Sequence, residues 1–205
     1  YLYKTIKIGS ILREEIFNFK KKDEIKREEN LNILVLGGSQ AAKTFAEKLP
    51  KIFVEFKKRG ANFKVIQQCI PSQNNYLSEI YSQNDLDFGI FNFSFEIIDY
   101  YKSTNLVITR GGSSAITELV NCNIPFICVP LPSAADNHQE KNARYFEKNG
   151  YCIKLSEDQI HNKLLQLLEK IDNDKSILNR IKNIQMKHSD KDVYMKIKTE
   201  IDKIL

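Results

Sequence analysis

Two glycine-rich stretches, GGSQ at residues 37–40 and RGGSS at residues 110–114, contain the residue types best suited to chemistry in this sequence. Each follows an apolar run and precedes a helical pattern, so we expect each to form a turn between a strand and a helix. Glycine lets the backbone approach a ligand closely, and free amides at a helix start attract anions. The glycine spacing fits neither the dinucleotide fingerprint nor a triphosphate loop. The turns favour a phosphate-bearing ligand, and the structural alternative for the first is a turn in which Ser39 caps the helix.

Glu118 follows the second turn and lies on the same helical face as Ser114. A phosphate bound at the helix start would leave Glu118 about 5 Å deeper, where its carboxylate can accept both adjacent hydroxyls of a ribose. The alternative is an exposed glutamate stabilised by the helix dipole. Ligands of parallel α/β sheets bind beyond the carboxyl ends of the strands, so both turns would face one crevice. This shared location favours a nucleotide.

A third stretch, VPLPSAADNHQEKNA at residues 129–143, is a long polar loop that enters a helix. Asp136 and Gln139 have the D-x-x-Q spacing of a capping box, which is a structural role. His138, Gln139 and Asn142 offer uncharged donors and acceptors that suit the hydroxyls of a sugar. The residues alone leave capping and sugar binding as equal alternatives.

Several classes of chemistry are not favoured by the remaining residues. The three histidines are scattered, and the four cysteines occur singly without a CxxC spacing, so neither a catalytic triad nor a metal site is expected. No cofactor is expected either. A departing diphosphate would then need helix N-termini and an arginine, for which Arg13 is the candidate.

The composition limits the partners of the chain. The net charge is +5, but the basic residues alternate with acidic ones on helical patterns, so we expect no nucleic-acid partner. No apolar run approaches the roughly 20 residues of a membrane span, so any membrane contact is expected to be peripheral. The sequence begins with Tyr1 inside an apolar alternation, from which we expect a fragment of a longer chain.

Short runs rich in Ile and Val alternate with helical stretches, which indicates an α/β fold with a Rossmann-like parallel sheet and helices on both faces. We expect strands at residues 32–36, 63–67, 86–92, 106–109, 125–129 and 151–154. We expect helices near residues 40–59, 73–83, 94–103, 113–122 and 137–149. Pro50 predicts a kink in the first of these helices or its division into two segments.

The two ends of the chain have different patterns. Residues 156–205 repeat apolar side chains at helical spacing, so we expect amphipathic helices that close the domain. Residues 20–30 are charged and poor in apolar side chains, which is typical of a mobile linker or an exposed helix.

Three motifs carry a resemblance to a known family: VLGGSQAAKTF at residues 35–45, ITRGGSSAITELVNCNIPFICVPLPSAADNHQEKNARYFEKNG at residues 108–150 and, more weakly, IKIGSILREEIF at residues 6–17. They resemble the carboxyl-terminal half of the MurG family, bacterial transferases that add N-acetylglucosamine to lipid I in peptidoglycan synthesis. The resemblance implies half of a metal-independent, inverting GT-B glycosyltransferase that binds UDP-N-acetylglucosamine. Residues 1–30 would then end a preceding domain or form a linker, and residues 31–205 would form the UDP-sugar-binding domain.

The resemblance also implies contacts for the phosphates and the ribose. Arg13 and Ser39 would contact the diphosphate, together with the amides of Gly38 and of residues 112–114, which are Gly112, Ser113 and Ser114. Glu118 would hold the ribose hydroxyls.

The remaining parts of the donor would meet other loops. Phe93 and Ser94 would meet the uracil, mainly through backbone groups, and His138, Gln139 and Asn142 would address the sugar.

The sequence departs from the family pattern at named positions. Ala41 replaces a usual glycine, so its methyl group could crowd a phosphate, and GSILR at residues 9–13 lacks the Asn and Pro of the family's GNPVR. His138-Gln139 stands where many members have two glutamines.

The part of the enzyme that holds the catalytic base and the lipid acceptor is expected in an amino-terminal half that this sequence lacks, so the chain alone should bind donor without turnover. The whole enzyme would work in the cytoplasm, peripherally on the inner face of the cell membrane, in cell-wall synthesis, cell shape and cell division. Two alternatives stay open. The chain could be the donor-binding subunit of another two-part GT-B glycosyltransferase with a membrane-bound partner, or a non-catalytic nucleotide-binding Rossmann domain.

Overall fold

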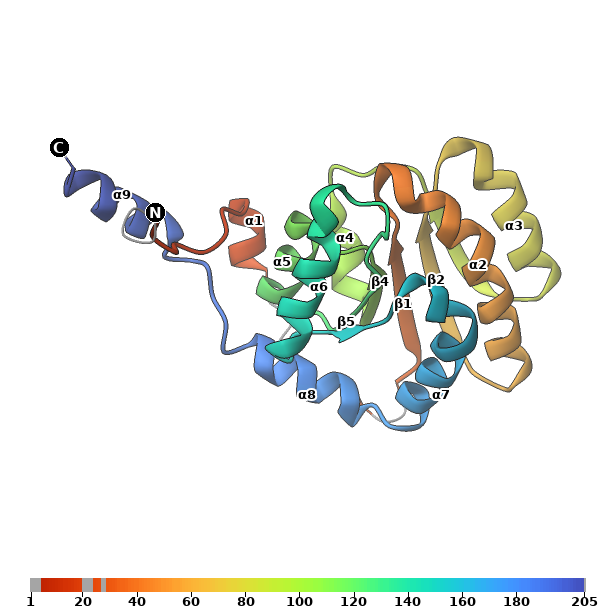
Figure 1. The fold of residues 1–205 in the computed structure, drawn as a ribbon. Coiled ribbons are helices and arrows are strands. Elements are labelled where there is room, and N and C mark those ends of the chain that lie inside the picture. The colour runs from red at the N-terminus through yellow and green to blue at the C-terminus, as the bar shows by residue number, and fades with distance from the viewer. Residues whose placement is uncertain (1–4, 20–23, 27–28, 205) are drawn as a thin grey trace.

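The fold is an alternation of strands and helices followed by carboxyl-terminal helices (Figure 1). The computed structural model describes residues 5–19, 24–26 and 29–204. The strands are β1 (Leu31–Leu36), β2 (Phe63–Gln68), β3 (Asp87–Phe91), β4 (Leu106–Thr109), β5 (Phe126–Cys128) and β6 (Ile153–Lys154). The helices are α1 (Glu14–Asn18), α2 (Gly38–Lys58), α3 (Asn74–Gln83), α4 (Ile97–Ser103), α5 (Ser113–Asn121), α6 (His138–Lys148), α7 (Leu165–Asn173), α8 (Ser176–Gln185) and α9 (Val193–Asp202). Each predicted strand and helix of the sheet domain is confirmed, with ends that differ by a few residues.

The six strands form one parallel sheet in the order β3-β2-β1-β4-β5-β6. The chain winds outward from β1 in one direction and then returns to continue from β4 in the other, so the strand order reverses between β1 and β4. Leu36 at the end of β1 pairs with Thr109 at the end of β4. The two glycine turns therefore leave the sheet side by side, at the position where ligands bind in doubly wound folds.

Side chains of the central strands alternate between two hydrophobic layers. Ile33 and Val35 of β1 pack with Phe53 of α2 on one face, whereas Leu34 packs with Leu119 of α5 on the other. Figure 1 shows α2, α3 and α7 over the first face and α4, α5 and α6 over the second. The expectation of helices on both faces is confirmed.

The helix α2 continues through Pro50, so of the two expected alternatives, a kink or a division into two segments, the division is wrong. Leu49 and Phe53, on either side of the proline, are fully buried against the sheet. Burial of each such side chain stabilises the helix by about 1.5–3 kcal/mol, which offsets the hydrogen bond that proline cannot donate.

The carboxyl-terminal helices behave differently from one another. Leu168 of α7 and Leu178 of α8 are buried, as expected for helices that close the domain. The last helix, α9, projects away from the sheet (Figure 1), and Tyr194, Met195 and Ile201 are 55%, 66% and 51% exposed. The expectation that this helix also closes the domain is wrong, because its apolar side chains do not reach the two hydrophobic layers. Within the part of the chain that the structure describes, no helix is long and apolar enough to cross a membrane.

The charged segment at residues 20–30 is partly described. Ile25 is buried, and its amide and carbonyl groups both hydrogen-bond to the side chain of Asn179 at 2.9 Å. The expectation of a mobile linker or exposed helix is therefore wrong at Ile25, because α8 pairs with its backbone. Residues 20–23 and 27–28 lie outside the described residues.

Hydrogen bonds of Asp190 link the segment that carries Arg13 to the sheet domain. Asn121 of α5 donates to Asp190 Oδ2 at 2.9 Å, and the Asp190 amide donates to Asn121 Oδ1 at 3.1 Å. His188 Nε2 lies 3.0 Å from the same buried carboxylate, which also accepts a hydrogen bond from the backbone amide of Ser10. Burial alone would raise the pKa of Asp190, but these hydrogen bonds outweigh burial and lower it.

We expect Asp190→Asn to lower the free energy of unfolding at pH 7 by about 2 kcal/mol, because it removes the charge from a hydrogen-bonded, buried carboxylate. The pKa of Asp190 is lower in the folded state, so the carboxylate stabilises the fold above the ordinary value of about 3.9. This contribution is lost as the pH falls through the folded pKa. Urea unfolding between pH 7 and pH 3 measures the effect. The difference in the free energy of unfolding between wild type and variant should become smaller on acidification. A difference that stays constant over this pH range would contradict stabilisation of the fold by the ionised Asp190 carboxylate.

Candidate functional site

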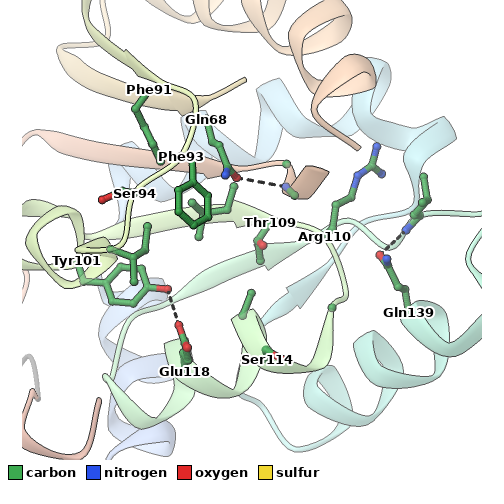
Figure 2. A pocket seen from close by; sticks show the side chains of 17 residues that line it. Gln68, Phe91, Phe93, Ser94, Tyr101, Thr109, Arg110, Ser114, Glu118 and Gln139 are labelled. Carbon is green, nitrogen blue, oxygen red and sulfur yellow. Dashed lines mark hydrogen bonds between the residues drawn. The ribbon is translucent and has the colours of Figure 1, made fainter. Parts of the chain in front are cut away.

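A cavity of about 460 Å³ opens at the carboxyl edge of the sheet, between the two glycine turns (Figure 2). Its lining residues come from both turns, from the ends of β2 and β3, from α4 and α5, and from the polar loop and the first turn of α6. They are Leu36, Gly37, Gly38, Gln68, Phe91, Phe93, Ser94, Ile97, Tyr101, Thr109, Arg110, Gly112, Ser114, Ala115, Glu118, Leu131 and Gln139. The structure therefore brings the two turns to one cavity, as the sequence predicts.

The first turn joins β1 to α2. Gly38 has a φ of +64°, a left-handed conformation that strains residues with a side chain, and its amide donates to Gln68 Oε1 at 3.3 Å. The N-cap position of α2 belongs to Gly37, which has no side chain with which to cap the helix. The alternative in which Ser39 is the cap is therefore wrong. The side chains of Ser39 and Ala41 lie outside the described residues, so the phosphate contact of Ser39 and the crowding by Ala41 stay predictions.

The second turn joins β4 to α5, with Gly112 at the N-cap position and no side-chain cap on the helix. Ser114 and Glu118 both line the cavity from the same face of α5, as their spacing predicts. Ser113 does not line it. The start of α5 thus presents amides that no side chain of the described residues caps, one turn away from a carboxylate.

Glu118 is held from two sides. Tyr101 Oη donates to Glu118 Oε2 at 3.4 Å, and Arg13 Nη2 lies 3.3 Å from Glu118 Oε1. The side chain of Glu118 is 16% exposed, whereas that of Arg13 is 48% exposed. Arg13 does not line the cavity, so the structure places it beside the candidate ribose residue, and its contact with a diphosphate stays a prediction.

Gln139 connects the polar loop to the second turn. Its Oε1 accepts hydrogen bonds from the amides of Gly111 at 3.1 Å and Leu131 at 3.0 Å. The N-cap position of α6 belongs to Asn137, without a side-chain cap, so the capping-box alternative for Asp136 and Gln139 is wrong. The two amides that Gln139 binds instead belong to the second turn and to the start of the polar loop.

The other two candidate sugar residues point elsewhere. Asn142 Nδ2 donates to the carbonyl of Gly111 at 3.0 Å, and His138 is exposed with its Nδ1 2.7 Å from the carbonyl of Ala135. Neither residue lines the cavity. Of the predicted sugar residues, the structure brings only Gln139 to it.

Phe93 and Ser94 line the cavity on a loop that follows β3. Phe93 is 69% exposed, and its ring packs edge-on against Phe95 at 4.8 Å between centroids. The loop is anchored at its first residue, because Asn92 Nδ2 donates to the carbonyl of Cys69 at 2.9 Å. A flat aromatic ring at the rim, as in Figure 2, suits the planar face of a base.

Comparison with known proteins assigns the family. Residues 32–197 match the model of the glycosyltransferase family 28 C-terminal domain. The chain belongs to glycosyltransferase family 28. The glycosyltransferase family predicted from the three motifs is confirmed.

Two curated relatives of this family 28 chain carry the name UDP-N-acetylglucosamine--N-acetylmuramyl-(pentapeptide) pyrophosphoryl-undecaprenol N-acetylglucosamine transferase. The protein from Pelagibacter ubique is 33% identical over 180 residues, which are 87% of this chain and 50% of the relative. The protein from Rickettsia prowazekii is 37% identical over 176 residues, which are 79% of this chain and 45% of the relative. The chain thus spans about half the length of the curated relatives it matches.

Solved structures support the family 28 fold. MurG from Acinetobacter baumannii superposes with a TM-score of 0.75 and 22% identity, covering 96% of this chain and 54% of that protein. A putative UDP-N-acetylglucosamine 2-epimerase from Listeria monocytogenes has a TM-score of 0.57 and 14% identity, covering 89% of this chain and 48% of that one. These likenesses show the Rossmann-like fold of a GT-B half.

Four polar cavity residues of the family 28 domain were missed by sequence reasoning: Gln68, Tyr101, Thr109 and Arg110. Arg110 is buried, 2.6 Å from Glu157 in an ion pair and 4.3 Å from the ring centre of Phe45. Burial lowers the pKa of this arginine, although Glu157 acts in the opposite direction. The position of Arg110 beside the glycine pair was a usable signal, whereas nothing in the pattern around Tyr101 distinguishes it from a core residue.

Proposed function

We propose that this family 28 domain binds UDP-N-acetylglucosamine and is the donor-binding part of an inverting N-acetylglucosaminyltransferase that converts lipid I to lipid II. One observation carries the proposal: the starts of α2 and α5 and the Glu118 carboxylate meet at one cavity where the strand order reverses. The names of the curated relatives supply the donor and the acceptor. In this proposal, residues 1–30 end a preceding domain or form a linker, and residues 31–205 are the donor-binding domain.

The diphosphate would lie between the amides of Gly38 and of residues 112–114, with help from Ser39 and Arg13. Each helix start carries a partial positive charge, and oriented amides stabilise an anion without a metal ion or a lysine. Glu118 would accept hydrogen bonds from the ribose hydroxyls one turn deeper along α5.

The uracil would meet the loop at Phe93 and Ser94. The sugar would extend toward Gln139, with His138 and Asn142 nearby on the first turns of α6. Gln139 also accepts a hydrogen bond from the Gly111 amide in the second turn, so it would fix the position of the sugar relative to the phosphates.

The chemical step would be attack of an acceptor hydroxyl on the anomeric carbon of the donor sugar. The bond from the anomeric carbon to the β-phosphate oxygen breaks, UDP leaves with the electron pair of that bond, the acceptor hydroxyl gives its proton to a base, and the configuration inverts. The domain described here would stabilise the charge that develops on the departing diphosphate. The base, the lipid acceptor site and peripheral contact with the cytoplasmic face of the membrane would belong to the whole enzyme, and no metal, cofactor or nucleic acid takes part.

A panel of ligands tests the donor assignment. UDP-N-acetylglucosamine and UDP are expected to stabilise the domain against heat, by about 2.7 kcal/mol at a hundred times the Kd, whereas NAD and ATP are expected to have no effect. The measurement is thermal unfolding with each ligand, and UDP-glucose serves as the matched control for the sugar. Selective stabilisation by NAD or ATP would show a plain nucleotide-binding module and overturn the proposal.

A second experiment tests the acceptor. The domain is combined with an amino-terminal half, and the lipid-linked product is assayed with lipid I and with other lipid acceptors. If product forms only from an acceptor other than lipid I, the result would favour a different two-part transferase.

A further inference from the structure

Tyr101 contacts Glu118, the candidate ribose-binding residue, from a different helix. It belongs to α4, is 1% exposed, and lines the cavity together with Glu118 of α5. Figure 2 shows its hydroxyl directed at the Glu118 carboxylate, with an Oη to Oε2 distance of 3.4 Å. The neighbouring Tyr100 stacks on Phe91 at 4.4 Å between ring centroids, which holds α4 against the end of β3.

The Tyr101 hydroxyl acts as a donor. Burial raises its pKa, and the negative charge of Glu118 raises it further, so the phenol keeps its proton at physiological pH. A phenylalanine would fill the same apolar space without a buried polar group to satisfy. The hydroxyl is therefore better explained by its carboxylate partner than by packing.

Arg13 occupies the other oxygen of the same carboxylate, with Nη2 3.3 Å from Oε1. A carboxylate oxygen has two lone pairs, so a partner on each oxygen still leaves one acceptor position on each. Two adjacent ribose hydroxyls need this arrangement: two acceptor positions at a fixed separation. Because the orientation is set before binding, the ligand does not have to immobilise the side chain.

We infer that Tyr101 is a positioning residue that holds Glu118 for the paired hydroxyls of a ribose, and that it gives the cavity a preference for ribonucleotides over 2′-deoxyribonucleotides. The inference rests on the proposed function, because it assumes that a nucleoside diphosphate occupies the cavity. A 2′-deoxy ligand offers only one of the two hydroxyls, so it gains less from a fixed carboxylate.

Tyr101→Phe removes the hydroxyl and leaves the ring. Calorimetric titration with UDP and with 2′-deoxy-UDP is expected to show about a threefold to tenfold loss of UDP affinity, because one hydrogen bond that orients the carboxylate is lost. The affinity for 2′-deoxy-UDP is expected to stay within about twofold, so the ribose preference shrinks. Tyr81→Phe is the matched control, because Tyr81 is also fully buried and donates to Gln67 Oε1 at 2.5 Å in the other hydrophobic layer.

Each outcome is decisive. Equal losses for both ligands, or no loss for either, would overturn the positioning role, because packing does not distinguish the two sugars. Failure of the wild-type domain to bind UDP at all would instead refute the proposed function. If Tyr101→Phe does not fold, wild-type protein carrying ¹³C at the tyrosine ring carbon bonded to the hydroxyl gives a second test. UDP should shift the Tyr101 resonance more than 2′-deoxy-UDP does, and equal shifts contradict the inference.

Discussion

Glu118→Ala is expected to weaken UDP-N-acetylglucosamine binding by about a hundredfold. In the proposed complex the carboxylate accepts two ribose hydroxyls, and two hydrogen bonds to a charged group at about 1.5 kcal/mol each account for that factor. The fold should survive, because Glu118 lies at the edge of the cavity with a 16% exposed side chain. Because Tyr101 Oη loses its partner in this variant, the free energy of unfolding is expected to fall by about 1 kcal/mol and the Tm by about 2–4 °C.

Isothermal calorimetry measures this effect, and Glu169→Ala is its control. Glu169 is also a helical glutamate in an ion pair, with Arg59 at 2.9 Å, and its side chain is 28% exposed on α7, which does not contribute to the cavity. The control should keep the affinity of the wild type. If Glu118→Ala also keeps it, the ribose assignment is wrong.

Gly111→Ala is expected to lower the free energy of unfolding by about 3 kcal/mol and the Tm by roughly 6–12 °C. A Cβ atom at this position would lie 2.5 Å from the carbonyl oxygen of Gln139, which is backbone. The backbone there cannot retreat easily, because Gln139 is bonded to the amides of Gly111 and Leu131 and Asn142 holds the Gly111 carbonyl. The added methyl group must push α6 away from the second turn.

Gly112→Ala is the matched control for this effect. It adds the same methyl group one residue later, where nothing lies within 4 Å of the new atom and φ is −67°. Its stability is expected to stay within about 0.5 kcal/mol of the wild type. Thermal and urea unfolding measure both variants, and similar losses for the two would show that the close approach of α6 to Gly111 is unimportant.

Much of the fold was open to prediction, because it depends on short-range patterns. The strand positions follow from runs of branched apolar residues, and the turns follow from paired glycines at the ends of such runs. Placement of Ser114 and Glu118 on one face of α5 follows from helical spacing alone. Parallel strands then bring the ends of β1 and β4 to the same edge of the sheet.

Other features were decided by contacts between segments far apart in the chain. Asp136 and Gln139 have a capping spacing, yet Gln139 binds Gly111, which is 28 residues away. The final helix has an apolar stripe, yet it lies away from both hydrophobic layers. In both cases a local pattern permits two structures, and only the position of a distant partner selects one.

The sequence alone determined the alternation of strands and helices, the two glycine turns and the chemical types gathered at them, because each depends on neighbours within a few residues. Tertiary structure alone decided that Tyr101 and Arg13 contact the two carboxylate oxygens of Glu118 and that Gln139 supports the second turn. The physical reason is that these hydrogen bonds join different elements. Their geometry therefore exists only after strand order and helix packing have brought those elements together.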